Sequence, residues 1–357
     1  MEKGTERQTD IEALRIICML LIISFHYAYK GGFTDDMPLI NGYIIKMFWM
    51  FGELGVNCFM LITGYFMVES CFKLRKLILL WIQVEMYNVA VMLIAYRIGI
   101  LQWTGKKAFI LQLLPVWQGK WWFVTAYVII YILSPFMKQF AKSISKRDYI
   151  KFLAICLVLW SVLPTVLGVF RNDTEGSLYY TRAVWLMIIW FTGGYIRLHG
   201  HPCIGPIKSW KKVFLITLAL IFSSILIIKH FNGFFAWLGT TEPAYLWRPN
   251  TTPMYVLSVS LFCIFLDMRL PHWKMIGKVA STTLGIYLLH DSILAGYIWG
   301  HIFKNGTHAA SPFLILHILS ATAAVFLVGA VVDLMRQHLV ERIVERWMDI
   351  LQEKDNK

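Results

Sequence analysis

Apolar runs long enough to cross a bilayer recur from one end of the sequence to the other, with short polar stretches between them. A helix needs about 20 mostly apolar residues to cross the hydrocarbon, so each run predicts one membrane-spanning helix. We predict about ten spans, at residues 11–30, 42–68, 75–98, 119–137, 149–170, 182–198, 212–230, 251–268, 276–300 and 312–334. The expected fold class is therefore all-α, a polytopic integral membrane protein.

The series of spans predicts a single membrane domain over residues 1–357, with a short N-terminal segment at 1–10 and a C-terminal tail at 336–357. The apolar stretch within residues 105–117 is too short to span, and it predicts an interfacial helix or a re-entrant turn. Acidic residues such as Glu2 spoil the basic start of a signal peptide, so we expect the first run to remain as a span.

Composition supports a membrane protein. Hydrophobic residues make up 58% of the chain and charged residues 15%, against about 25% charged residues in soluble domains. A net charge of +13 can indicate nucleic-acid binding, but the basic residues stand in short clusters between apolar runs. We therefore expect the lipid bilayer, and no nucleic acid, as a partner. The six cysteines lie in apolar runs or in predicted cytoplasmic loops, which argues against a disulfide framework and against a zinc site.

The basic clusters also predict the orientation of the protein. An even number of spans puts both termini on one side of the membrane. If that side is the cytoplasm, about two thirds of the 34 basic residues fall in inside segments, as the positive-inside rule requires. We predict a multi-pass protein of the cell membrane with both termini in the cytoplasm.

Arg15 and His26 are the first candidate functional residues. They are eleven residues apart, which puts them within about 20° of one helix face and about 16 Å apart along the axis. Glu12, one turn before Arg15, can orient it. Arg15 alone is equally well explained as a charge that reaches to the interface, whereas a central imidazole needs a polar partner or a cavity. The pair indicates a polar path from the cytoplasm toward mid-membrane.

Four further residues are candidates for binding a substrate. Glu53 and Asn57 are four residues apart in the second predicted span, and Tyr127 and Tyr131 are four apart in the fourth, so each pair shares a helix face. Polar residues inside spans are functional hypotheses by default, and the alternative is that they only support packing.

Two more features complete the set of candidates. His290 lies about 20 Å above the start of the ninth predicted span, a depth comparable to that of His26, so the two histidines can share a site. Lys73, Arg75 and Lys76 form a basic cluster before the third predicted span. This cluster is either an ordinary cytoplasmic loop or a site for an anionic cofactor.

Five stretches, taken in order, resemble the membrane acyltransferase-3 family of bacterial integral-membrane acyltransferases. They are IEALRIICMLLIISFHY, GVNCFMLITGYF, WWFVTAYVIIYILSPF, WFTGGYIRLHG and LGIYLLHDSI. In the first, the spacing of Arg15 and His26 is that of the family's first span. Thr63 stands at the serine position of the second stretch. The chain departs from the family pattern at two places. Lys73-Leu-Arg-Lys76 stands where many members carry an Arg-x-x-Arg motif, and the esterase-like domain that many members carry fused to the membrane domain is not expected here.

The resemblance implies transfer of an acyl group, usually acetyl, from cytoplasmic acyl-CoA to a hydroxyl of a cell-surface or lipid-linked glycan at the bacterial plasma membrane. Arg15 and the basic cluster would contact the phosphates of acetyl-CoA. His26 would act as general base or as a transient acyl carrier. Glu12 and His290 would support it, and no metal is expected. Without an esterase-like domain, any second transfer step would need another protein.

Two alternatives stay open. The first is a transporter or flippase of a small molecule such as an amino acid or an acyl-bearing donor. Broken helices and inverted repeats would favour it, and no repeat is visible in the sequence. The second is a structural membrane subunit of a polysaccharide assembly complex, which would tolerate substitution of both histidines. The sequence leaves the glycan acceptor, the acyl chain and the oligomeric state unknown.

Overall fold

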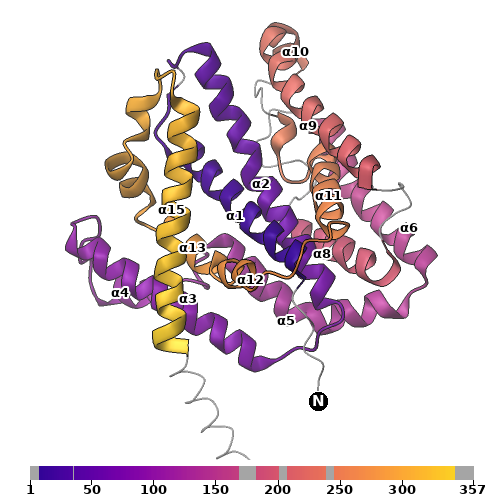
Figure 1. Cartoon of the computed structure of the whole chain (residues 1–357), viewed down its shortest axis with the longest axis horizontal. Helices are drawn as coiled ribbons and strands as arrows, with labels where there is room; N and C mark the ends of the chain where they lie inside the picture. The colour runs from indigo at the N-terminus through magenta and orange to yellow at the C-terminus, as the bar shows by residue number, and fades with distance from the viewer. Residues whose placement is uncertain (1–7, 35, 169–181, 201–206, 239–244, 342–357) are drawn as a thin grey trace, which may run out of the picture.

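The computed structural model describes residues 8–34, 36–168, 182–200, 207–238 and 245–341, and these form helices joined by turns (Figure 1). In chain order the α-helices are α1 (Thr9–Lys30), α2 (Leu39–Met67), α3 (Leu74–Arg97), α4 (Lys106–Gln112), α5 (Trp122–Ser143), α6 (Lys146–Leu157), α7 (Leu163–Leu167), α8 (Arg182–His199), α9 (Ile207–His230), α10 (Asn232–Leu238), α11 (Thr252–Leu266), α12 (Lys274–Ala280), α13 (Thr283–His290), α14 (Ala295–Tyr297) and α15 (Leu314–Arg336). Shorter 3-10 and π segments are η1 (Val158–Val162), η3 (Tyr245–Trp247), η4 (Ile298–Ile302), η5 (Asn305–His308) and η6 (Gln337–Glu341).

Seven of the described helices are long and apolar enough to cross a membrane, judged by length and composition. They are Thr9–Lys30, Leu39–Met67, Leu74–Arg97, Trp122–Ser143, Lys146–Leu167, Ser209–His230 and Leu314–Val340. The protein is therefore an all-α, multi-pass membrane protein, as predicted. The short stretch before the fourth predicted span forms only the seven-residue helix α4.

The first and last described helices run in opposite directions. Near the end of α1, the Tyr27 hydroxyl is 2.6 Å from Nδ1 of His317, which belongs to the first turns of α15. The start of α1 and the end of α15 therefore lie at the same end of the molecule (Figure 1). This arrangement agrees with an even number of crossings.

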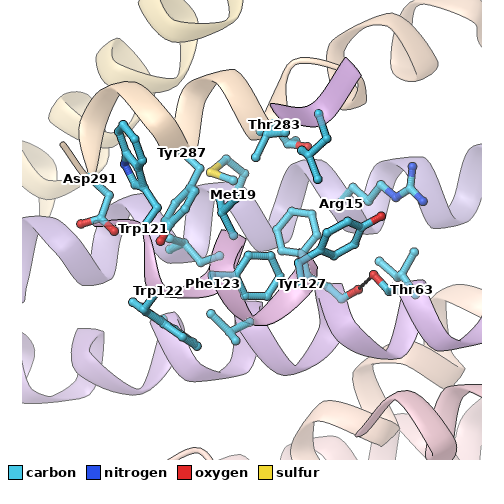
Figure 2. A pocket seen from close by; sticks show the side chains of 18 of the residues that line it. Arg15, Met19, Thr63, Trp121, Trp122, Phe123, Tyr127, Thr283, Tyr287 and Asp291 are labelled. Carbon is cyan, nitrogen blue, oxygen red and sulfur yellow. Dashed lines mark hydrogen bonds between the residues drawn. The ribbon is translucent and has the colours of Figure 1, made fainter. Parts of the chain in front are cut away.

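Helix α1 is central in the fold, because it packs against α2, α11, α12, α13 and α15. A helix surrounded in this way has few positions that face lipid. Arg15 and Met19 of α1 instead point into a cavity that runs beside the helix (Figure 2).

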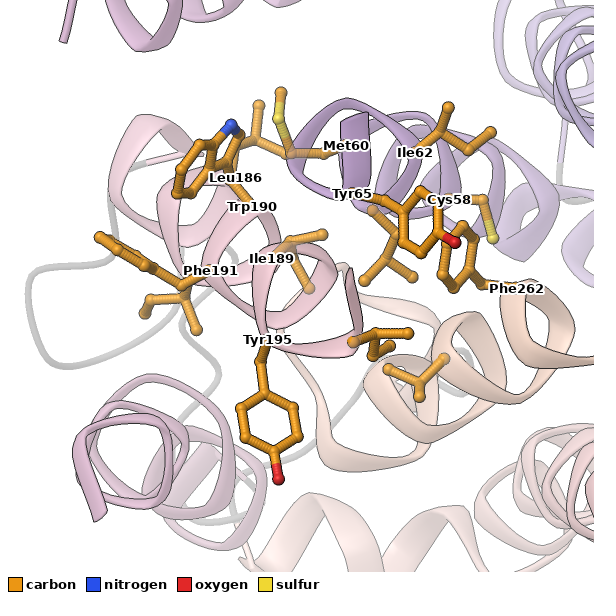
Figure 3. Packing of buried hydrophobic residues seen from close by; sticks show 14 of the residues in the cluster. Cys58, Met60, Ile62, Tyr65, Leu186, Ile189, Trp190, Phe191, Tyr195 and Phe262 are labelled. Carbon is orange, nitrogen blue, oxygen red and sulfur yellow. The ribbon is translucent and has the colours of Figure 1, made fainter. Parts of the chain in front are cut away.

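Two glycines bring α2 and α8 into backbone contact. A Cβ at Gly64 would lie 2.1 Å from the Trp190 carbonyl oxygen, and one at Gly193 would lie 2.2 Å from the Leu61 carbonyl oxygen. Small residues allow such close approach of membrane helices. Around this contact, buried side chains of α2, α8 and α11 pack together, including Met60, Trp190 and Phe262 (Figure 3). This part of the core is apolar and closely packed.

Two further helices stand where spans were predicted. Helix α8, with 18 residues, matches the predicted span 182–198, and α11 has 15 residues within the predicted span 251–268. Segment 276–300 is not one helix, and this prediction was wrong. It breaks between α12 and α13 and again after α13.

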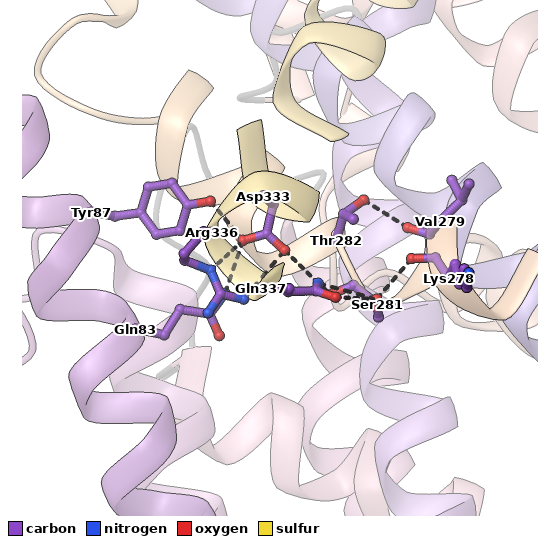
Figure 4. A network of polar contacts seen from close by, with 9 residues as sticks. All are labelled: Gln83, Tyr87, Lys278, Val279, Ser281, Thr282, Asp333, Arg336 and Gln337. Carbon is purple, nitrogen blue, oxygen red and sulfur yellow. Dashed lines mark hydrogen bonds and ion pairs between the residues drawn. The ribbon is translucent and has the colours of Figure 1, made fainter. Parts of the chain in front are cut away.

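Hydroxyl side chains bond to the backbone at both breaks. Ser281 and Thr282 donate to the carbonyl oxygens of Lys278 and Val279, each at 2.7 Å (Figure 4), and after α13 the Ser292 hydroxyl donates to the Leu289 carbonyl at 2.7 Å. Side chains that bond nearby backbone offer the chain an alternative to the helical ladder. Non-helical backbone at membrane depth is tolerated where it is buried or lines a cavity, and here it brings His290 toward α1.

Candidate functional site

A cavity of about 1320 Å³ runs along α1 through the described structure. Figure 2 shows Arg15 and Thr63 near one end of it and Asp291 near the other, with Met19 and Phe123 between them. We call these the Arg15 end and the Asp291 end. The cavity therefore extends over much of the length of a membrane-spanning helix.

One face of α1 forms a wall of this cavity. The residues of α1 on that wall include Glu12, Arg15, Met19, Ile22, His26 and Lys30, which follow one another at intervals of three or four. This is the periodicity of a single helix face. Arg15 and His26 thus lie on one wall, as their spacing predicted.

His26 meets His290. Nδ1 of His26 lies 2.9 Å from Nε2 of His290, and Nδ1 of His290 lies 2.6 Å from the Ile286 carbonyl oxygen. A carbonyl only accepts, so Nδ1–H of His290 donates to it, and a neutral His290 accepts at Nε2 from Nδ1–H of His26. This assignment from the hydrogen-bond network leaves Nε2 of His26 with a free lone pair.

The free nitrogen of His26 faces an ion pair that the sequence analysis did not include in the site. Its Nε2 lies 3.5 Å from Oδ1 of Asp291, and the Lys30 ammonium donates to the same oxygen. His26, Asp291 and Lys30 line the cavity. The sequence did carry a signal for both residues, because Lys30 follows His26 by one turn and Asp291 is next to His290.

At the Arg15 end, Arg15 is held by a carboxylate. Its Nη1 donates to both oxygens of Glu12, at 3.0 and 3.3 Å, and its guanidinium lies 5.8 Å from the centre of the Phe66 ring. Arg197, which the sequence analysis missed, also lines the cavity, forms an ion pair with Glu69 and donates to the Tyr65 hydroxyl at 3.2 Å. With Lys76, the cavity wall here carries three basic side chains against the carboxylates of Glu12 and Glu69, so this end has an excess of positive charge.

Only part of the basic cluster before α3 lines the cavity. Lys76 lines the cavity, whereas Lys73 and Arg75 are not among the described residues that form its wall. The backbone of Lys73 is instead fixed by Tyr131, whose hydroxyl bonds to its N–H and to its carbonyl, both at 3.1 Å. Tyr131 and Tyr127 do line the cavity, with their rings stacked 6.2 Å apart.

Of Glu53 and Asn57, only Glu53 lines the cavity. Glu53 is 7% exposed and lines the cavity. Asn57 is fully buried away from it, donates to the Pro249 carbonyl at 3.0 Å and accepts from Nε1 of Trp185 at 3.1 Å. Two positions four apart share a helix face, but that face is wide enough to meet both a cavity and a neighbouring helix.

Part of the wall of this cavity, which we call the lobe, is polar. Lys120 donates to the Asn88 amide oxygen at 3.1 Å and to the Gln112 carbonyl at 2.6 Å, and all three residues line the cavity. Burial lowers the pKa of Lys120 from its ordinary value, and the nearby Glu85 carboxylate opposes this shift. The lobe offers donors and acceptors for a polar ligand. Within the described ranges, no three His, Cys, Asp or Glu side chains come together in a way that would hold a metal ion.

The family model of the acyltransferase 3 group, described as an acyltransferase domain, matches residues 8–334. This match covers all the helices that line the cavity. Comparison with curated proteins gave no significant match, and neither did comparison with solved structures.

Proposed function

Because the chain belongs to the acyltransferase 3 family, it is a membrane acyltransferase that uses an acyl donor, and we propose that it transfers acetyl from cytoplasmic acetyl-CoA to a hydroxyl of a glycan. The glycan is at the cell surface or linked to a lipid. One observation carries the proposal. A single cavity joins a basic end at Arg15 to an imidazole with a free nitrogen at the other end.

The Arg15 end suits the anionic part of the donor. Arg15, Lys76 and Arg197 line it, and charge-assisted hydrogen bonds from such residues bind phosphates strongly. Arg15 and His26 are separated by about 16 Å along α1, a reach that suits an extended pantetheine arm. In this proposal Arg15 binds a phosphate, and the thioester lies beside His26.

His26 acts as the general base. Its Nε2 takes the proton of the acceptor hydroxyl while that oxygen attacks the thioester carbonyl carbon. His290, through the 2.9 Å contact with Nδ1 of His26, fixes the ring in the required tautomer. Formation of an acyl-imidazole on His26, followed by transfer to the acceptor, is the alternative route.

The Asp291 end suits a saccharide. Tyr29, Trp122 and Trp247 line the cavity, and such rings present an apolar face together with a polar tip. Glu53, whose carboxylate makes no hydrogen bond within the described residues, can accept from a sugar hydroxyl. We assign the acceptor to this end.

The broken segment α12–α13–α14 is the one feature that favours a transporter, since discontinuous helices form substrate sites in many transporters. In this protein the same break brings His290 and Asp291 to His26. The break is therefore accounted for by the acyl-transfer site.

Membrane vesicles with the cytoplasmic face outward test the proposal. They are prepared from cells that make both the protein and their own surface glycans, and acetyl-labelled acetyl-CoA is added. We expect label to appear on glycan. We expect the His26→Gln variant to transfer about 10²–10⁴-fold less, while His301→Gln, at an exposed histidine away from the cavity wall, behaves like the unaltered protein. Uptake of labelled small molecule without transfer to glycan would support the transporter instead.

A further inference from the structure

We infer that Lys30 and Tyr287 form an oxyanion site, which stabilises the negative charge on the carbonyl oxygen during acyl transfer, and that Asp291 holds Lys30 in position. This inference rests on the proposed function, because it concerns the same acyl-transfer site. It adds two catalytic residues and one positioning residue to that site.

Lys30 is held next to the base. It follows His26 by one turn of α1, and its ammonium donates to Oδ1 of Asp291. That same oxygen lies 3.5 Å from Nε2 of His26. The Lys30 ammonium and the free nitrogen of His26 therefore both lie next to Oδ1 of Asp291.

Tyr287 points to a missing ligand. Its hydroxyl is buried, lines the cavity and makes no hydrogen bond of good geometry within the described part of the chain, although the Asp291 carboxylate and the Phe123 backbone lie close to it. Tyr287 and Asp291 lie side by side in Figure 2. Buried polar groups nearly always have a partner, so a phenol that lacks one is available to donate to a bound molecule.

The ion pair also differs from one that only holds helices together. The side chain of Asp291 is 9% exposed and that of Lys30 is 32% exposed, and both line the cavity. Charges inside a membrane protein are costly, and they mark reaction or transport paths when they face a cavity. A structural pair would gain nothing from facing the cavity.

The chemistry balances. The acceptor oxygen forms a bond to the thioester carbon, Nε2 of His26 takes the hydroxyl proton, and the carbonyl π pair moves onto the carbonyl oxygen. Lys30 and Tyr287 donate hydrogen bonds to that oxyanion. When the carbonyl re-forms, the carbon–sulfur bond breaks and the thiolate takes the proton from His26. Donors placed where charge develops are often the largest contribution to such catalysis.

Two single variants test the oxyanion site. We expect Lys30→Gln and Tyr287→Phe each to lower the maximal rate of label transfer by about 10²-fold or more, because this is the effect of losing one oxyanion donor. Binding of acetonyl-CoA, an unreactive ketone analogue of acetyl-CoA, should stay unchanged. Lys30→Arg keeps the charge and should recover part of the rate. Tyr195→Phe, in the core where α8 packs against Tyr149 of α6, should transfer normally.

A double variant separates catalysis from structure. Lys30→Met combined with Asp291→Leu removes both charges, so that no unpaired charge stays buried. A purely structural pair predicts that this protein regains activity, whereas the oxyanion site predicts that it folds, binds acetonyl-CoA and stays slow. Normal rates in Lys30→Gln or in the double variant would overturn the inference. If the unaltered protein transfers no label at all, the proposed function itself fails.

Discussion

Two buried polar clusters lie against the broken segment 274–302, and they differ in how completely their groups are satisfied. The first surrounds Asp333, which is fully buried and does not line the cavity (Figure 4). Asp333 accepts from the Tyr87 hydroxyl at 2.6 Å, from Arg336 at 2.7 Å and from Gln337 at 2.8 Å. Every oxygen of this carboxylate has a partner.

The second cluster surrounds His26 and is left open. Nε2 of His26 is 3.5 Å from Asp291, too far for a good hydrogen bond, and the Tyr287 hydroxyl makes no hydrogen bond of good geometry with a described residue, although Asp291 lies close to it. His26, Lys30 and Asp291 line the cavity, whereas Asp333 and its partners Tyr87, Arg336 and Gln337 do not. A satisfied polar network fixes structure, whereas one with free groups is available for chemistry. The Asp333 cluster therefore stabilises the broken segment, whereas the His26 cluster is available for the reaction.

Substitution of His26 should give the largest effect. In His26→Gln, the amide replaces one ring nitrogen but cannot take a proton, so transfer should fall by about 10²–10⁴-fold. The melting temperature in detergent should change little, because an amide can still donate to His290. Measured together, these two results would assign the His26 cluster to the reaction. A large loss of melting temperature would contradict the assignment.

Substitution of Asp333 should have the opposite outcome. Asp333→Leu removes the carboxylate that accepts from Tyr87 and Arg336, which should destabilise the protein by about 3–5 kcal/mol. The fraction that still folds should transfer at a nearly normal rate. Asp148→Leu, at an exposed ion pair with Lys151, serves as the control and should change the melting temperature far less.

An Asp333→Leu variant of normal stability that loses activity would contradict the proposed difference between the Asp333 cluster and the His26 cluster. The Asp333 cluster would then belong to the reaction path. Thermal unfolding and label transfer, measured on the same preparation, distinguish the two results.

Asn57 provides a smaller test of the same distinction. Asn57→Leu removes the acceptor of Trp185 and the donor to Pro249, so we expect a loss of about 1–3 kcal/mol in stability with an unchanged KM for the acceptor. Glu53→Gln, four residues earlier on the cavity wall, should instead raise that KM. An Asn57→Leu variant of normal stability and raised KM would return Asn57 to the binding site.

Substitution of Arg15 should have the mildest effect. Arg15→Gln should weaken binding of acetyl-CoA by about tenfold, since a hydrogen bond to a charged group is worth about 1.5–3 kcal/mol. The maximal rate should change little at saturating donor. Arg147→Gln, an exposed basic residue away from the cavity, is the matched control. Unchanged binding of acetyl-CoA by Arg15→Gln would contradict the assignment of the CoA phosphates to the Arg15 end.

Helical periodicity explains what the sequence could predict. The interval between Arg15 and His26 fixed their common face, and the apolar runs located most helices, because both properties are local. The breaks after α12 and α13 were missed, since Ser281 and Ser292 look like ordinary polar residues of an apolar run, and hydroxyls with the same local bonds also occur inside unbroken helices. The partners of Asn57 come from α8 and from the turn before α11, and no local pattern reveals them.

Lys30, Asp291 and Arg197 were missed for a related reason. Each stands at or near the end of a helix, where a charged residue is usually explained by solvent or by the membrane interface. Only the tertiary structure brings Lys30 and His26 to the same oxygen of Asp291. Arg197 likewise gains its meaning from the cavity that its side chain lines.

The structure of the protein bound to acetonyl-CoA tests the central claim most directly. We predict that the CoA phosphates lie against Arg15 and Lys76, and that the ketone carbon lies within about 6 Å of Nε2 of His26, close enough for an acceptor hydroxyl between them. Binding of CoA at the Asp291 end, or with its ketone outside the cavity, would contradict this.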